Sequence, residues 1–195
     1  MRRFASPALL ILLVAAAGCH PLASTRTEEA LLADGYVVVE GLRVPEVEGN
    51  AGCGAQALAA VMAHGDPARD PVALGAELPW HDVGATPVDL LLAARNDGFE
   101  ARVEAGTVER LVEEASAGRP AVVMLDVAPV WPSLLLGAIP LGTAMHWAVV
   151  TGIGDDGARI LLGAPDGRHH VVDGADFQAR WERADRCLIV VTPAR

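Results

Sequence analysis

The chain has 195 residues, of which 52% are hydrophobic and 21% charged, and it carries a formal net charge of −10 at pH 7. This length suits a single domain, and the high apolar content excludes an intrinsically disordered chain. The acidic balance argues against nucleic acid as a partner and against charge-driven binding to an anionic membrane surface.

The first eighteen residues are predicted to form a signal peptide. A basic pair at Arg2-Arg3 precedes the apolar stretch 7–17, which is too short to span a bilayer. Small residues stand directly before Cys19, a pattern that resembles a bacterial lipobox and implies that Cys19 is lipidated as the first mature residue. His20 then implies sorting to the outer membrane, facing the periplasm. The alternative is an ordinary secretory signal with a cysteine at its cleavage region.

Residues 19–35, which contain interspersed Ser, Thr and Glu, are expected to form a tether between lipid and domain. A single domain follows over 36–195. It begins with two brief predicted strands at 36–39 and 42–44.

Helix signals dominate the next part of the domain. Residues 54–64 place apolar side chains at helical spacing, residues 86–98 begin with Thr86 as N-cap and Pro87 at the first helical position, and a third helix is predicted over 107–118. Strands are predicted later in the chain, over 121–127, 146–153, 159–162, 169–172 and 187–192. A short helix that contains Phe177 and Trp181 precedes the last of them. Helices first and strands second indicate an α+β fold.

Between two of the predicted strands, residues 128–144 are unusually apolar for a surface loop. Two interpretations stay open: the segment lines a substrate cleft, or it covers an edge of the sheet.

Cys53 is the first candidate for chemistry. It lies between two glycines at the start of the predicted helix, where unpaired backbone N–H groups and the helix dipole favour a thiolate. His146 opens an apolar strand far downstream, and the fold can bring it beside Cys53 as general base. The alternative is a Cys53–Cys187 disulfide; we favour Cys187 as an inert core residue of the last strand.

Short motifs along the chain carry a family resemblance. They are Val44-Pro45, Cys53-Gly54-Ala55-Gln56-Ala57-Leu58, the strand Gly118–Met124, His146-Trp147-Ala148-Val149-Val150-Thr151-Gly152, and the helix with Phe177 and Trp181. Together they resemble the papain-like peptidases that process the double-glycine leaders of bacteriocins, and the C39-like lipoprotein relatives of that family. The resemblance implies a papain-like fold, with N-terminal helices packed on a C-terminal antiparallel sheet.

Two positions depart from the family pattern. The family has an oxyanion-binding glutamine six residues before the nucleophile, where this chain has Val47; Asn50 carries an amide that can take this role. The family also orients its histidine with an Asp-Pro pair, and the aligned position here is Ala164. Asp166, two residues later, is the candidate acid. Its alternative role is that of a turn residue in Pro165-Asp166-Gly167.

The resemblance implies a lipid-anchored cysteine peptidase of the bacterial envelope, hydrolysing peptide bonds with Cys53, His146 and Asp166. It would act as a monomer on a peptide or protein substrate without a cofactor. We expect no metal site, because His169 and His170 are adjacent on a strand and point to opposite faces. The alternatives are an inactive peptide-binding module on the same fold, and acyl transfer or amidase action on a non-peptide amide.

Overall fold

A computed structural model describes residues 24–46, 52–77, 84–127, 130–133, 137–140, 144–165 and 167–194, with side chains outside 130–140. An eight-stranded sheet organises this part of the chain, in the order β1-β9-β8-β7-β4-β10-β3, with β2 paired to β7. Each recorded strand pair is antiparallel. The strands are β1 (Ser24–Arg26), β2 (Val37–Val38), β3 (Phe99–Ala105), β4 (Ala121–Asp126), β7 (Met145–Gly154), β8 (Arg159–Gly163), β9 (His169–Asp173) and β10 (Cys187–Pro193).

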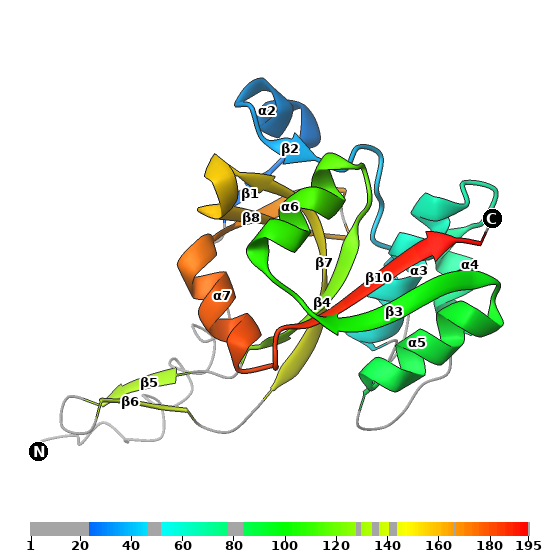
Figure 1. Ribbon diagram of the computed structural model, residues 1–195. Helices are drawn as coiled ribbons and strands as arrows, with labels where there is room; N and C mark the ends of the chain where they lie inside the picture. The colour runs from blue at the N-terminus through cyan, green and yellow to red at the C-terminus, as the bar shows by residue number, and fades with distance from the viewer. Residues whose placement is uncertain are drawn as a thin grey trace, which may run out of the picture.

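Helices cover both faces of the sheet (Figure 1). On one face lie α3 (Cys53–Gly65), α4 (Pro71–Glu77) and α5 (Pro87–Asn96); on the other lie α6 (Val108–Ser116) and α7 (Gly174–Glu182). A short helix, α2 (Glu28–Ala33), precedes β2. The predicted α+β class is therefore confirmed, and helices pack on both faces of the antiparallel sheet.

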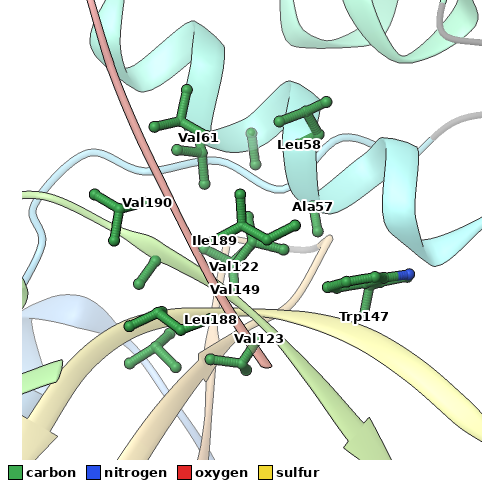
Figure 2. Packing of buried hydrophobic residues seen from close by; sticks show 14 of the residues in the cluster. Ala57, Leu58, Val61, Val122, Val123, Trp147, Val149, Leu188, Ile189 and Val190 are labelled. Atoms are coloured by element: carbon green, nitrogen blue, oxygen red, sulfur yellow. The ribbon is translucent and has the colours of Figure 1, made fainter. Parts of the chain in front are cut away.

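The central helix is α3. An apolar sequence all round a helix is typical of one buried on every side, and α3 packs against the sheet, α4 and α5. Figure 2 shows its apolar side chains above the middle of the sheet, with Trp147 at one end of the group. The core residues labelled there are Ala57, Leu58, Val61, Val122, Val123, Trp147, Val149, Leu188, Ile189 and Val190.

Five of the described helices begin with a side-chain cap, among them α2, capped by Thr27, and α4, capped by Asp70. Thr86, Thr107 and Asp173 each accept hydrogen bonds from backbone N–H groups in the first turns of α5, α6 and α7. In contrast, α3 begins after Gly52, which has no side chain to cap it. With no side-chain cap, the first turn of α3 is closed by its own backbone, where the N–H of Ala55 donates to the oxygen of Gly52 at 3.0 Å.

The strand β7 is longer than its neighbour β8. The pairing with β8 covers β7 from Val150 to Gly154, whereas the pairing with β4 covers residues 145–150. The first half of β7 thus extends past β8, and α3 packs against β7. This offset is the feature of the fold that lets the start of a helix reach the backbone of β7.

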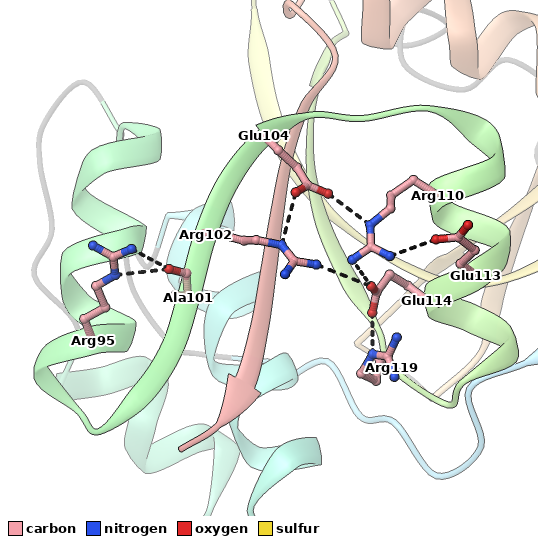
Figure 3. Close-up of polar contacts among 8 residues, drawn as sticks. All are labelled: Arg95, Ala101, Arg102, Glu104, Arg110, Glu113, Glu114 and Arg119. Atoms are coloured by element: carbon pink, nitrogen blue, oxygen red, sulfur yellow. Dashed lines mark hydrogen bonds and ion pairs between the residues drawn. The ribbon is translucent and has the colours of Figure 1, made fainter. Parts of the chain in front are cut away.

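A buried carboxylate fixes α6 to the edge of the sheet. Glu114 is 1% exposed and forms ion pairs with Arg110, Arg119 and, at 3.9 Å, Arg102 of β3 (Figure 3). Glu104 pairs with both Arg102 and Arg110 at 3.1 Å. A buried charge is tolerated only when it is paired, so these arginines offset the cost of burying the Glu114 carboxylate.

Several elements differ from those that the sequence predicts. Residues 24–26 and 28–33, within the expected tether 19–35, form β1 and α2, so folded structure begins before residue 36. The predicted strand 42–44 is not a strand; Leu42 and Val44 are buried in a segment without regular secondary structure instead. The strand β3 is not predicted, although Phe99, Ala101 and Val103 alternate there with charged residues.

In the segment 128–144, the described backbone forms a hairpin of β5 (Val130–Ser133) and β6 (Gly137–Pro140). These two strands pair with each other and form a sheet separate from the main one (Figure 1). Both interpretations of this segment stay predictions. Within the described residues, no helix has the length and apolar character needed to cross a membrane; the apolar stretch 7–17 lies outside them.

Candidate active site

The two residues predicted to form a catalytic pair lie together. Cys53 is the first residue of α3, and its half-buried thiol accepts a hydrogen bond from the backbone N–H of Trp147 in β7 at 3.3 Å. The exposed side chain of His146, one residue earlier on the same strand, also hydrogen-bonds the thiol. The offset between β7 and β8 thus brings the start of α3 to a backbone donor and an imidazole at once.

The surroundings of the thiol favour its ionised form. Burial by itself would raise the pKa of Cys53, but the His146 hydrogen bond, the backbone N–H of Trp147, the charge of His146 and the backbone N–H of Gly54 outweigh it. The net pKa of Cys53 is therefore lower than its ordinary value. A half-buried thiol with a lowered pKa and an adjacent imidazole is the arrangement of a cysteine nucleophile.

Comparison with known proteins places this arrangement in a known fold. No model of a protein family matches the chain, and no curated protein matches it in sequence. Among solved structures, the peptidase domain of Streptococcus ComA, a bifunctional ABC transporter involved in a quorum-sensing pathway, is similar with a TM-score of 0.54 and 21% identity. That alignment covers 78% of this chain and 98% of the ComA domain.

Two further structures agree. A protein described as a C39-like peptidase from Bacillus anthracis has a TM-score of 0.60 and 17% identity, covering 83% of this chain and 99% of its own. A double-glycine-motif protease from an AMS/PCAT transporter, solved in complex with the leader peptide, has a TM-score of 0.52 and 18% identity, covering 80% and 97%. This chain has the C39 peptidase fold. At such identities the likeness establishes the fold alone.

Trp147 contributes to this C39-fold site in a second way. Its indole N–H donates to the carbonyl oxygen of Ala85, just before α5, at 2.8 Å. Its ring lies so close to α3 that a Cβ added at Gly54 would stand 2.9 Å from the ring atom Cδ1 and 3.0 Å from the Cβ of Ala85. Packing therefore favours glycine after the nucleophile, since a larger residue 54 would press against Trp147 of β7 and against Ala85, just before α5.

Three predicted functional residues lie outside the described residues: Asn50, Asp166 and Cys19. Their roles stay predictions. The turn around Asp166 is nevertheless framed by described residues, because the N–H of Ala164 donates to the oxygen of Arg168 at 3.0 Å and that of Gly167 to the oxygen of Ala164 at 3.2 Å. Ala164, where the family pattern has its acid, is buried.

The cysteines are not joined. Cys53 and Cys187 are both free, so the alternative of a disulfide between them is not supported. Cys187 is buried in β10, where burial and then the charge of Asp185 raise the pKa of its thiol to about 11. Its environment is thus opposite to that of Cys53, as expected for an inert core residue.

The two adjacent histidines of β9 differ in their environments. His169 is buried, and its Nδ1 lies 2.7 Å from the hydroxyl of Thr151, whereas His170 is only half-buried. Among the residues that the structure describes, no group of three or more histidines, cysteines and acids is placed to hold a metal ion.

Sequence reasoning missed the parts played by Trp147 and Ala85. The aromatic residue after His146 is visible in the motif. Its hydrogen bonds to Cys53 and Ala85, however, depend on how β7 packs against α3 and the residues before α5. A tryptophan directly after a candidate catalytic histidine is the available signal, because a buried indole N–H needs an acceptor.

Proposed function

We propose that this protein is a cysteine peptidase that hydrolyses peptide bonds through Cys53 and His146. One observation carries the proposal: at the uncapped start of α3, the Cys53 thiol is held by the N–H of Trp147 and by the His146 side chain, and its pKa is lowered. The same surroundings would serve no purpose for a cysteine that only fills the core.

The chemistry follows from this geometry. The Cys53 thiolate attacks the carbonyl carbon of a peptide bond, while the backbone N–H of Cys53 itself, at the start of α3, stabilises the negative charge that develops on the carbonyl oxygen. His146 then gives its proton to the departing amine as the carbon–nitrogen bond breaks. Water, deprotonated by His146, hydrolyses the thioester and restores the thiol.

A peptide is the substrate class that the comparisons support best. The double-glycine-motif protease with the same fold was solved with a leader peptide, and a half-buried thiol beside the exposed His146 can be reached by a peptide chain. The competing proposal is an inactive peptide-binding module. The lowered pKa of Cys53 favours catalysis over binding, since a module that only binds peptide has no need of a thiolate.

The proposed location is the bacterial envelope, with Cys19 lipidated and the domain facing the periplasm. This part of the proposal rests on the small residues before Cys19 and the short apolar stretch before them. Detergent partitioning tests it: Cys19→Ser should move the protein to the aqueous phase with its fold intact. An unchanged membrane association would remove the lipid anchor from the proposal.

Digestion of a peptide library, read by mass spectrometry, tests the activity and defines the cleavage preference. The wild-type protein should produce cleaved peptides, whereas Cys53→Ala and His146→Ala should produce none. Cys187→Ser is the matched control, because it removes the other described thiol and should leave cleavage intact. Identical digests from wild type and Cys53→Ala would refute the proposed peptidase activity.

A further inference from the structure

The ends of the long uncharged segment between β4 and β7 are fastened to each other. No charged residue occurs from Val127 to Ala144, and these two residues meet where the segment leaves and rejoins the sheet. The N–H of Val127 donates to the oxygen of Ala144 at 2.8 Å. The main-chain contact closes the base of the segment, one residue before β7 begins.

A buried carboxylate strengthens this closure. Asp126, the last residue of β4, is 2% exposed. Its Oδ1 accepts from the N–H of Ala144 at 3.4 Å, and its Oδ2 accepts from Nε of Arg183 at 3.0 Å. The same arginine, at the end of α7, also donates from Nη2 to the main-chain oxygen of Asp126 at 3.5 Å.

Arg183 is itself held in place, because its Nη1 donates to the oxygen of Ala179 one turn earlier in α7. The guanidinium therefore connects the C-terminal end of α7 to the end of β4, and Asp126 in turn is hydrogen-bonded by the N–H of Ala144. A buried carboxylate is costly unless paired, so this pair must form for the strand ends to pack as they do.

The strand register connects the pair to the proposed active site. Asp126 stands opposite Met145 in the β4–β7 pairing, and the next pairs are Leu125 with His146 and Met124 with Trp147. The pair is therefore one residue along β7 from the imidazole and two from the N–H that donates to the Cys53 thiol. Both groups that contact the thiol therefore lie within the first three residues of β7, next to the end of the strand that Asp126 fastens.

We propose that Asp126, through Arg183 and the N–H of Ala144, is a positioning residue that holds the start of β7 in the register that places the Trp147 N–H and His146 against the Cys53 thiol. The inference rests on the proposed function for its purpose but concerns a property of the resting protein. Neither Asp126 nor Arg183 touches the substrate or the reacting atoms in this account; they act through the backbone of Met145–Trp147.

Alkylation of Cys53 by iodoacetamide across a pH range tests the proposal without any substrate. Asp126→Asn keeps the size of the side chain and removes its charge. We expect the pH midpoint of alkylation to rise by about one unit, the size of shift that a weakened hydrogen bond or charge contact produces. Hydrogen exchange at the Trp147 amide, followed by NMR, should become faster in the same variant.

Glu182→Gln is the matched control. Glu182 pairs with Arg186 at 2.6 Å at the same end of α7. Both side chains are about half exposed, and within the described residues this ion pair includes no residue of β4 or β7. This variant should leave the midpoint and the Trp147 exchange unchanged. If Asp126→Asn does not fold, Arg183→Lys retains the charge with fewer donors and should give a smaller shift in the same direction.

A folded Asp126→Asn protein with the wild-type midpoint and wild-type exchange at Trp147 would overturn the proposal, as would an equal shift in Glu182→Gln. Failure of the proposed function looks different. In that case the wild-type protein would cleave no peptide of the library, and the alkylation midpoint and Trp147 exchange in Asp126→Asn would still decide whether Asp126 holds β7.

Discussion

The backbone N–H of Trp147 donates to the sulfur of Cys53 at 3.3 Å, joining residues 94 positions apart in the sequence. A main-chain donor cannot be removed by changing a side chain, so the ionisation of this thiol depends on where β7 lies against α3. His146 adds a side-chain contact from the preceding position of the same strand. Reactivity at Cys53 is thus a direct report on the packing of helix and strand.

The two described thiols should therefore differ in their response to pH. The pKa of Cys53 lies below the ordinary value of 9.0, and that of Cys187 is raised to about 11. Since the thiolate is the reacting form, alkylation of Cys53 should reach half its maximal rate below pH 9, while Cys187 stays unreactive until well above it. Peptide mapping after alkylation measures both. His146→Ala should move the Cys53 midpoint upward; a midpoint unaffected by this change would show that the imidazole does not act on the thiol.

Gly54→Ala should destabilise the protein although alanine is the better helix former. Helix propensity alone would favour alanine by about 1 kcal/mol. However, the added Cβ would meet Trp147 and Ala85 at 2.9 and 3.0 Å, and overpacking of this kind costs about 1–3 kcal/mol. Urea unfolding measures the difference.

Gln56→Ala, a half-buried position on the same helix, serves as the control and should be nearly neutral. A Gly54→Ala protein more stable than the wild type would mean that the contact between Trp147 and α3 is looser than described.

Trp147→Phe separates the two hydrogen bonds of this residue. The substitution removes the indole donor to Ala85 but retains the backbone N–H. We expect a loss of about 1–2 kcal/mol in the free energy of unfolding with little change in the Cys53 alkylation midpoint. Trp181→Phe, which loses a similar bond to the oxygen of Cys187 at 3.0 Å, should cost a comparable amount. A large midpoint shift in Trp147→Phe alone would assign the indole a part in ionising the thiol.

Much of the fold could be predicted because local signals were strong. Thr86 and Pro87 mark the start of α5, and the apolar runs that became β4, β7 and β10 are found within one or two residues of their predicted bounds. The strand β3 was missed because its exposed face carries the charged residues Glu100, Arg102 and Glu104. Arg102 and Glu104 pair with each other, and their further partners, Glu114 and Arg110, come from α6.

The site was predictable only in part, for a related reason. Cys53 and His146 are visible as residue types in a helix start and a strand start. The contacts that the sequence does not reveal, the donation from the Trp147 N–H to Cys53 and the Asp126–Arg183 pair at the end of β4, depend on strand register and on the offset of β8. No spacing in the sequence encodes that offset, since it arises from how β7, β8 and α3 pack together.

Glu114 should matter for stability and not for the thiol. It is buried with three arginines around it, so Glu114→Gln leaves them without their shared carboxylate. We expect a loss of about 2–4 kcal/mol, less than for a fully buried network because the arginines are partly hydrated.

Glu113→Gln breaks an ion pair with Arg110 on the same helix, but its side chain is 66% exposed, and the loss should stay below about 1 kcal/mol. Thermal unfolding distinguishes the two. Equal losses would show that burial of Glu114 adds nothing to the pairing, and a changed alkylation midpoint in Glu114→Gln would couple this cluster to the site.

Asp166→Asn tests the third member of the proposed triad. Because β8 runs antiparallel to β7, the turn after Gly163 emerges at the end of the sheet where β7 begins. If Asp166 orients His146, the variant should keep its fold and lose roughly 10- to 10⁴-fold in turnover number. Steady-state kinetics on a cleaved peptide provides the measurement. Unchanged turnover would leave a Cys53–His146 dyad, with Asp166 as a turn residue.

The most direct test of the central claim is a double-mutant cycle on turnover. The rate of cleavage of one peptide from the library is compared for wild type, Cys53→Ala, His146→Ala and the double variant. Because a nucleophile and its base act as a unit, each single variant should lose nearly all activity and the double variant should be little worse than either. Losses that add in free energy, or a Cys53→Ala protein that still cleaves at the wild-type rate, would contradict the account.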